Sequence, residues 1–224
     1  MSRNFIFGCT SLARRLFYSL KNDGYITDAF VVDDKYCDQD QFCGISLAPY
    51  SKVEKLFPAT EYDAYVAVGY TSMNAVRKEV IERLLALGYS LPNYIHRSAI
   101  CENVTIGKGN LLFPGSFFDL DIQIGDGNVF FPGVLISHDA KINNYNFFAP
   151  RATLAGGITV GSQNFFGLNC SVGNGIKIGD SCFIGASAYA AHDLNDRDVL
   201  VPPRSTLMEK DSYDVMRNWQ QNIN

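Results

Sequence analysis

The residue pair best suited to catalysis is His138-Asp139, in the stretch LISHDAKINN at residues 135–144. A neutral imidazole can accept a proton near pH 7, and a carboxylate on its other ring nitrogen would fix the tautomer and strengthen the base. Neighbouring side chains on a straight strand point to opposite faces, so the two groups can meet only at a corner of the chain. The alternative is an ordinary polar pair at a bend.

The residues around this pair follow a repeat of six. Apolar or small residues occupy every sixth position from Ile100 to Ala190, and Gly or Asn follows such a residue at intervals of eighteen. Six residues per side and three sides per turn predict a triangular parallel β-solenoid of about five coils. We expect the sixth-position residues to point inward and Gly and Asn to take the sharp corners, where φ can be positive. We interpret Cys170 and Cys182, at a second inward position, as core residues rather than reactive thiols.

This repeat predicts the neighbours of His138. One coil is eighteen residues, so Gly156 should lie beside His138, about 4.8 Å along the axis. A glycine there leaves its backbone N–H accessible as an oxyanion donor, although a tight corner alone also explains the residues LAGG at 154–157. His192 lies three coils away, or roughly 14 Å, which is too far to share a proton-transfer site. We interpret His192-Asp193 mainly as a cap, and His96, at the entry to the solenoid, as structural.

Residues 1–95 alternate strand-like and helical segments instead. Strands are expected at 5–8, 28–34 and 63–69, and helices at 10–24, 51–57 and 72–88. This alternation predicts a small Rossmann-like parallel sheet with right-handed crossovers. The expected organisation is an α/β domain at 1–95, the solenoid at 96–206 and a C-terminal tail at 207–224.

An open α/β sheet binds phosphate where a strand ends and a helix begins. In this chain that point is Gly8, and the neighbouring helix N-terminus would face a nucleotide diphosphate. The ends of the next two strands are suited to a base or ribose hydroxyl and to close approach of a ligand. No complete GxGxxG motif is present, so these residues alone leave nucleotide binding open. The candidate residues of this site are Gly8, Cys9, Thr10, Ser11, Asp33, Asp34, Gly69 and Tyr70.

The composition argues against several other classes of function. The net charge is −4 and no long basic run is present, so neither nucleic acid nor a membrane surface is an expected partner. No run of about 18 apolar residues predicts a membrane span. Six cysteines without CxxC spacing and no predicted signal peptide favour the reducing cytoplasm. No two of the three histidines lie closer than 42 residues, so no metal site is expected.

Nearly end to end, the chain resembles the hexapeptide-repeat acyltransferases, in particular the branch of sialic-acid O-acetyltransferases and nucleotide-amino-sugar N-acetyltransferases. The matching features are the repeat, Gly8, Asp33-Asp34, VAVG at 66–69, YIHRSA at 94–99 and SHDAKI at 137–142. The resemblance implies a left-handed β-helix that assembles as a homotrimer, with coenzyme A between neighbouring subunits. Two positions depart from the family: the first turn, Gly8-Cys9-Thr10-Ser11, lacks a histidine, and Phe147 replaces a histidine of bacillosamine-type members.

The activity implied by this resemblance is acetyl-CoA-dependent N-acetylation of a nucleotide-linked deoxyamino sugar, a precursor of bacterial surface glycans such as lipopolysaccharide O-antigen. His138 would be the general base, Asp139 its orienting carboxylate and Gly156 the oxyanion donor. Coenzyme A would lie near Ala155, Gly156, Gly173, Asn174, Lys177 and Arg204, with His192 as a further contact if it is not only a cap. Two alternatives stay open: O-acetylation of a sugar such as sialic acid, and a non-catalytic scaffold that binds sugar nucleotides, which Phe147 mildly favours.

Overall fold

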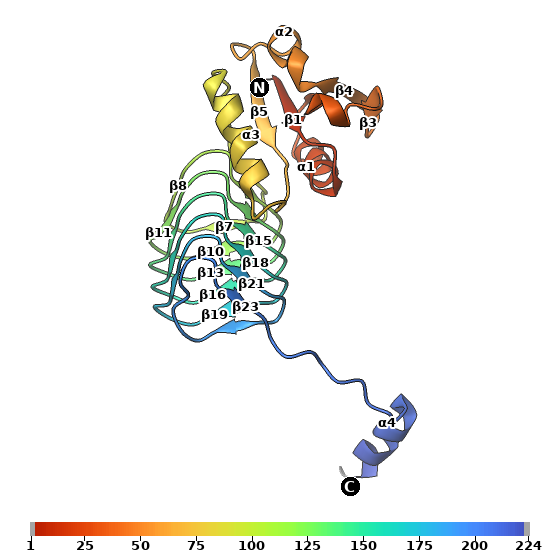
Figure 1. The fold of residues 1–224 in the computed structure, drawn as a ribbon, viewed down its shortest axis with the longest axis vertical. Coiled ribbons are helices and arrows are strands. Elements are labelled where there is room, and N and C mark those ends of the chain that lie inside the picture. Colours follow the sequence, from red (N-terminus) through yellow and green to blue (C-terminus); the bar gives the residue numbers. More distant parts are fainter. Residues whose placement is uncertain (1–2, 222–224) are drawn as a thin grey trace.

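The computed structural model of the chain describes the backbone of residues 3–221 and the side chains of residues 3–217. Figure 1 shows three parts in sequence order: an α/β domain, a parallel β-helix, and a C-terminal arm that ends in a helix. The described N-terminal residues and the arm lie at opposite ends of the molecule. The predicted fold class, a small α/β domain followed by a left-handed parallel β-helix, is confirmed.

The N-terminal domain is built on a five-stranded sheet with the order β3-β4-β2-β1-β5. Its strands are parallel except for the short antiparallel hairpin β3–β4, which the sequence did not predict. The expected strands and helices are all present. The strands are β1 (Arg3–Phe7), β2 (Thr27–Val32), β3 (Gln41–Phe42), β4 (Ile45–Pro49) and β5 (Tyr62–Val66). The helices are α1 (Ser11–Asn22), η1 (Asp34–Tyr36), η2 (Tyr50–Lys52), α2 (Val53–Leu56) and α3 (Ala75–Ala86).

The β-helix has three flat faces, each a parallel sheet whose strands are two or three residues long. The first face contains β7 (Ile100–Cys101), β10 (Phe117–Phe118), β13 (Leu135–Ile136), β16 (Thr153–Leu154), β19 (Ser171–Val172) and β22 (Tyr189–Ala190). The second face contains β8 (Val104–Ile106), β11 (Ile122–Ile124), β14 (Lys141–Ile142), β17 (Thr159–Val160) and β20 (Lys177–Ile178). The third face contains β6 (Tyr94–Ile95), β9 (Leu111–Leu112), β12 (Val129–Phe130), β15 (Phe147–Phe148), β18 (Phe165–Phe166), β21 (Phe183–Ile184) and β23 (Val199–Leu200).

The core of the β-helix consists of residues one coil apart. Phe130, Phe148 and Phe166 form a stacked column with ring centroids 4.6 and 4.5 Å apart. Cys170 and Cys182 are buried in this core, as predicted, and burial raises the pKa of the Cys170 thiol to about 12. The expected inward position of Ile100 is wrong, because its side chain is 49% exposed. The first coil is one residue shorter than the others, so that Ile100 pairs with the outward-facing Phe117.

The recurring glycines have a different role from the one expected. Their φ angles are ordinary, and the positive φ at this corner falls two residues later, where Tyr145 and Gln163 adopt it as well as glycine. A Cβ atom at these glycines would collide with atoms of the next coil, including a side-chain oxygen of an Asp or Asn. Close stacking of coils, rather than φ, therefore requires glycine at Gly107, Gly125, Gly161 and Gly179.

The N-terminal domain docks on the third face of the β-helix. Residues of α1 share one buried cluster with residues of β9, β12 and β15. The ring of Tyr70 lies 5.0 Å from that of Phe147 and 4.8 Å from that of Phe165. β6 pairs with β9, so the third face already begins at Tyr94, two residues before the expected domain boundary. The two parts are thus joined by a sheet and a shared core.

Arg77, on α3, fastens the two parts together. It is 1% exposed, and its guanidinium donates hydrogen bonds to the carbonyls of Gly69, Gly127, Tyr145 and Asn146 at 2.7 to 3.1 Å. No carboxylate pairs with it among the side chains of residues 3–217. Burial lowers the pKa of Arg77 to about 9. A buried charge satisfied by these four carbonyl dipoles fixes the position of the loop around Gly69.

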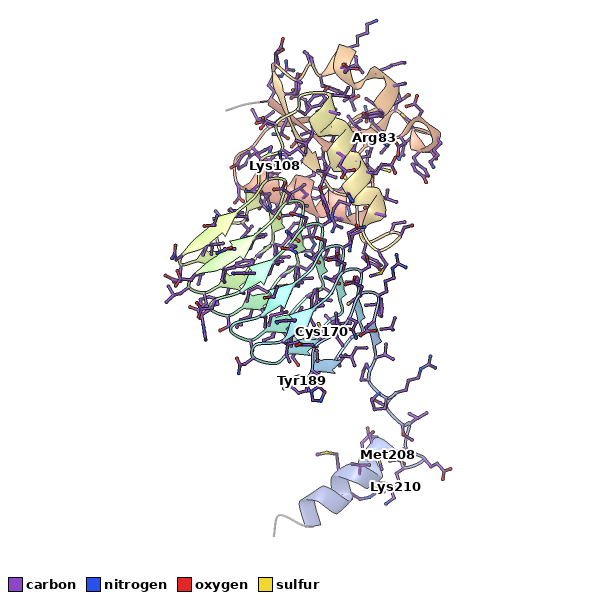
Figure 2. The ribbon with its side chains drawn as sticks, turned by 60° about the vertical axis from the view of Figure 1, so that its left-hand side comes forward. Arg83, Lys108, Cys170, Tyr189, Met208 and Lys210 are labelled. Atoms are coloured by element: carbon purple, nitrogen blue, oxygen red, sulfur yellow. The ribbon has the colours of Figure 1, made fainter. Side chains whose placement is uncertain are left out.

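The C-terminal arm leaves the β-helix after β23 and ends in α4 (Ser212–Gln221) (Figure 1). Figure 2 shows Met208 and Lys210 on this arm, apart from the body of the molecule. The side chain of Leu207 is 95% exposed. Across residues 3–221, no helix combines the length and the apolar character that crossing a membrane would require.

Candidate active site

His138 and Asp139 lie at the corner between β13 and β14, which we call the histidine corner. Asp139 has a φ of 56°, so the chain turns sharply between the two strands. This turn brings the side chains together, and His138 Nδ1 lies 2.8 Å from Asp139 Oδ2. The side chains are 57% and 68% exposed. The arrangement leaves Nε2 of the imidazole directed away from the carboxylate, which is the geometry of an oriented base.

Gly156 lies directly beneath the imidazole. β13 pairs with β16 in a register of eighteen residues, which places Gly156 one coil on from His138. A Cβ atom at Gly156 would lie 2.5 Å from both Cε1 and Nε2 of the ring, so the ring rests against bare backbone. The second glycine has a separate reason, because Gly157 has a φ of 70°.

The backbone N–H of Gly156 is not free, contrary to the expectation from the sequence. It donates a hydrogen bond to Asn174 Oδ1 at 3.1 Å. Asn174 lies one coil beyond Gly156 at the same corner, and its short side chain reaches back along the axis to the N–H. An oxyanion could use this donor only after Asn174 had turned away.

The remaining candidates for contact with coenzyme A lie in different parts of the structure. Ala155 and Gly173 are half-buried next to the histidine corner, on the coils of Gly156 and Asn174. Lys177 is exposed on the second face, and Arg204 lies on the C-terminal arm beyond β23. The structure therefore groups His138, Asp139, Gly156 and Asn174, places Lys177 just after this corner at the start of β20, and places Arg204 on the C-terminal arm.

The two other histidines are placed differently from His138. His192 is exposed at the last coil, and the neighbouring Asp193 accepts the N–H of Lys177 at 2.8 Å, which holds the end of the β-helix. His96 accepts the N–H of Ser98 at 3.1 Å in a turn at the start of the β-helix. The bonds of His96 and Asp193 fit the structural interpretations made from the sequence, and the contact of His192 with coenzyme A stays a prediction.

The N-terminal domain contains a cavity of about 540 Å³ at the carboxyl edge of its sheet. Of the predicted acceptor residues, those that line it are Gly8, Cys9, Thr10, Asp33 and Gly69. Sequence reasoning missed further lining residues after β2, although their position after a strand end was a usable signal; they are Lys35, Tyr36, Asp38 and Gln39. A Cβ atom at Gly8 would lie 2.7 Å from the carbonyl oxygen of Ala67, so only glycine lets β1 approach β5 here.

Asp33 is held in place at the rim of this cavity. Its Oδ1 accepts a hydrogen bond from Arg83 at 2.7 Å, and the Arg83 guanidinium lies 3.9 Å above the Tyr50 ring. Burial raises the pKa of the Cys9 thiol in the same cavity. The carboxylate of Asp33 thus has a fixed direction, which suits a hydroxyl ligand.

Three predicted acceptor residues lie outside the cavity. Ser11 faces a separate groove along α1. Asp34 accepts the N–H of Ser51 at 3.0 Å, and its hydrogen bonds to Ser51 lower the pKa of that carboxyl. Tyr70 packs on the third face of the β-helix, as described above.

Comparisons with known proteins bear on the fold. No protein-family model matches the chain, and no curated protein matches its sequence. Solved structures match along most of its length. PerB from Caulobacter crescentus, in complex with CoA and GDP-perosamine, is 26% identical with a TM-score of 0.81, covering 89% of this chain and 93% of that one. The acetyltransferase domain of PglB from Neisseria gonorrhoeae, in complex with acetyl coenzyme A, is 21% identical with a TM-score of 0.78, covering 90% and 99%.

A third structure extends the match further. It is a variant of GDP-perosamine N-acetyltransferase from Caulobacter crescentus with one histidine replaced by alanine, 24% identical, with a TM-score of 0.83 and coverage of 94% of this chain and 98% of that one. The chain has the fold of the hexapeptide-repeat sugar acetyltransferases. The resemblance stated from the sequence is confirmed at this level.

Within the hexapeptide-repeat fold, Phe147 has a structural role in this chain. It is 5% exposed and packs between Tyr70, Phe131 and Phe165 where the N-terminal domain docks. The departure from a histidine at this position is therefore explained by apolar packing. Phe147 lies on the third face, away from the histidine corner.

The histidine corner and the acceptor cavity also lack the side chains of a metal centre. No three His, Cys, Asp or Glu side chains gather in a metal-binding arrangement within the described part of the chain. The chemistry available at the corner is accordingly that of an imidazole, a carboxylate and backbone amides.

Proposed function

We propose that this chain is an acetyl-CoA-dependent N-acetyltransferase that acetylates the amino group of a nucleotide-linked deoxyamino sugar, a precursor of a bacterial surface glycan. The observation that carries the proposal is the exposed His138 imidazole, oriented by Asp139 at 2.8 Å and resting against the backbone of Gly156. The ligands of the similar structures support the same class: CoA with GDP-perosamine in one, and acetyl coenzyme A in another.

The proposed reaction uses the corner as follows. The amine nitrogen attacks the carbonyl carbon of the thioester, and His138 Nε2 takes the proton that the amine loses. Asp139 occupies the Nδ1 side and keeps Nε2 as the acceptor. The Gly156 N–H stabilises the oxyanion once Asn174 has turned away. The C–S bond then breaks, the amide forms, and the thiolate of coenzyme A receives the proton.

The acceptor would bind in the cavity of the N-terminal domain. Its diphosphate would lie at Gly8, where the N-terminus of α1 offers free N–H groups and a partial positive charge. The oriented carboxylate of Asp33 would accept a ribose hydroxyl. The features that support this placement are the close approach at Gly8, the cavity of about 540 Å³ and the ion pair of Asp33 with Arg83.

The geometry of a single chain supports a shared active site in a homotrimer. The N-terminal domain docks on the third face, whereas the histidine corner joins the first and second faces and lies across the β-helix from it. One chain would not present an acceptor in its own cavity to its own His138, but a neighbouring chain would. The first face offers an apolar contact surface, with Ile100 49%, Leu135 37% and Tyr189 62% exposed.

A thiol-release assay tests the proposal. Purified protein is mixed with acetyl-CoA and a panel of UDP-, dTDP- and GDP-linked amino sugars, and the mass of the product identifies an N-acetyl group. We expect turnover with one amino sugar and none with the corresponding sugar that lacks the amine. Binding of a sugar nucleotide without thiol release across the panel would contradict the proposal and favour a scaffold.

The O-acetyltransferase alternative is tested in the same assay. The base and the acyl donor would be the same, so sialic acid and a nucleotide-linked sugar with only hydroxyl groups belong in the panel. Release of thiol with those substrates alone would replace N-acetylation by O-acetylation. A cytoplasmic location belongs to the same proposal, since the six cysteines are free thiols.

A further inference from the structure

The hydrogen bond between Gly156 and Asn174 is an unusual feature of the histidine corner. Asn174 is exposed, yet its carboxamide oxygen accepts the Gly156 N–H at 3.1 Å. This N–H belongs to the residue against which the imidazole rests, because a Cβ atom at Gly156 would lie 2.5 Å from Cε1 and Nε2 of His138. The oxygen of Asn174 therefore occupies a backbone donor of the residue that supports the proposed base.

A second corner of the β-helix shows what such bonds do elsewhere. Between the second and third faces, side-chain oxygens accept the backbone N–H of the residue one coil earlier at successive coils. The donors and acceptors are Lys108 and Asp126, Asp126 and Asn144, Asn144 and Ser162, and Ser162 and Asp180. Such a series joins the coils continuously, which is a structural role.

At the histidine corner the series is interrupted. Gly156 has no side chain to accept the His138 N–H, and the His138 side chain is bonded to Asp139 instead. Among the described residues, Asp193 makes a similar bond to Lys177 at the last coil, and the bond from Gly156 to Asn174 is the one whose donor residue lies against the His138 ring. A single bond contributes little to joining coils that are already paired through β13, β16 and β19. Its position next to the base is the feature that needs an explanation.

We infer that Asn174 is a positioning residue whose carboxamide oxygen occupies, in the free protein, the place of the thioester carbonyl oxygen. This inference rests on the proposed function. A backbone N–H directs one proton at one acceptor, so the carbonyl of acetyl-CoA and Oδ1 of Asn174 compete for Gly156. Acetyl-CoA binds productively when the Asn174 side chain turns away, and the oxygen returns when the acyl group has left.

This competition weakens the binding of acetyl-CoA but not that of CoA. Acetyl-CoA has a carbonyl that needs the Gly156 N–H, whereas CoA has a thiol and no carbonyl. Molecules in which Asn174 is bonded to Gly156 cannot bind acetyl-CoA productively, so the apparent affinity for acetyl-CoA falls in proportion to their fraction. CoA binds whether or not this hydrogen bond is present. For one neutral, part-buried hydrogen bond this weakening is about two- to tenfold.

Calorimetric titration of the wild type and Asn174→Ala with acetyl-CoA and, separately, with CoA tests the inference. In Asn174→Ala, we expect the Kd for acetyl-CoA to fall about two- to tenfold and the Kd for CoA to stay within about twofold. Asn174→Asp keeps an acceptor and adds a negative charge, so its affinity for acetyl-CoA should fall instead.

Asn144→Ala is the matched control, since it removes the same type of bond to Asp126 at the other corner. It should change neither Kd. Three results would overturn the inference: an unchanged or higher Kd for acetyl-CoA in Asn174→Ala, an equal shift for CoA, or a tenfold loss of saturating turnover. The last would mean that Asn174 acts as a donor to the oxyanion. Failure of the wild type to bind acetyl-CoA at all would refute the proposed function itself, which is a distinguishable result.

Discussion

Two corners of the same β-helix use polar side chains in opposite ways. At the corner before the third face, Asn110, Asn128, Asn146 and Asn164 are fully buried, and each of the last three donates its backbone N–H to Oδ1 of the one before at 2.8 Å. At the histidine corner the side chains are exposed and the axial bonding is interrupted at Gly156. We call the first the asparagine corner.

The comparison separates stability from chemistry. Buried amides must be hydrogen-bonded, because an unsatisfied buried group costs roughly 1–3 kcal/mol. Asn110, Asn128 and Asn146 meet that requirement, whereas Nδ2 of Asn164, at the end of the series, has no partner among the described residues. The histidine corner lacks a continuous series of side-chain hydrogen bonds, although backbone hydrogen bonds still join its coils, and it gains an accessible base. We therefore expect substitutions at the two corners to affect different measurements.

The largest expected effect is that of His138→Ala. Loss of a general base should lower kcat for thiol release by at least about 10²-fold. The free energy of unfolding should change by less than about 0.5 kcal/mol, since the side chain is 57% exposed. His192→Ala is the control, because it removes the other His-Asp pair at the end of the β-helix, and it should retain turnover. Near-normal activity of His138→Ala would remove the base from the mechanism.

The next effect concerns the asparagine corner. Asn146→Ala removes the acceptor of the Asn164 N–H and donors to the carbonyls of Asn143 and Gly161. We expect a loss of about 2–5 kcal/mol in the free energy of unfolding, measured by denaturant at fixed protein concentration. Turnover per folded molecule should be unchanged. Asn144→Ala, at the same corner, loses a half-buried bond and should cost no more than about 1 kcal/mol, and equal losses in the two variants would contradict the role assigned to burial.

Gly156→Ala tests the contact between Gly156 and the His138 ring. The new Cβ would lie 2.5 Å from the imidazole, so the ring must move. Displacement by about an ångström should lower kcat by tenfold or more. The measurement is a double-mutant cycle with His138→Ala, in which Gly156→Ala should cause little additional loss. A full additional loss would mean that Gly156 acts independently of the ring.

Asp139→Asn has the smallest expected effect. Asparagine tolerates the φ of 56° at this position, so the turn should persist while the charge is lost. Because the Asp139 side chain is 68% exposed, solvent screens its interaction with the imidazole. We expect kcat to fall about two- to fivefold. A loss as large as that of His138→Ala would show that the carboxylate does more than orient the ring.

Prediction from the sequence succeeded where the repeat applies. The eighteen-residue period placed Gly156 beside His138, and it required the corner at Asp139 that brings the two side chains together. It failed for Ile100, because one coil is a residue shorter and the pattern of apolar residues does not reveal that change. In the N-terminal half, strand ends indicated Gly8, Asp33 and Gly69 but also Ser11, Asp34 and Tyr70, which lie outside the cavity.

The sequence by itself determined the period, and with it the faces, the corners and the residues that follow one another along the axis. In a regular backbone repeat, residues eighteen positions apart in the sequence are neighbours along the axis. Only the tertiary structure decided that Asn174 takes the Gly156 N–H, that Arg77 joins two domains, and that Phe147 supports docking. These contacts depend on which way a side chain turns and on how a non-repeating domain packs against a repeating one. Neither is encoded in a local pattern, because both are set by competition among groups distant in the chain.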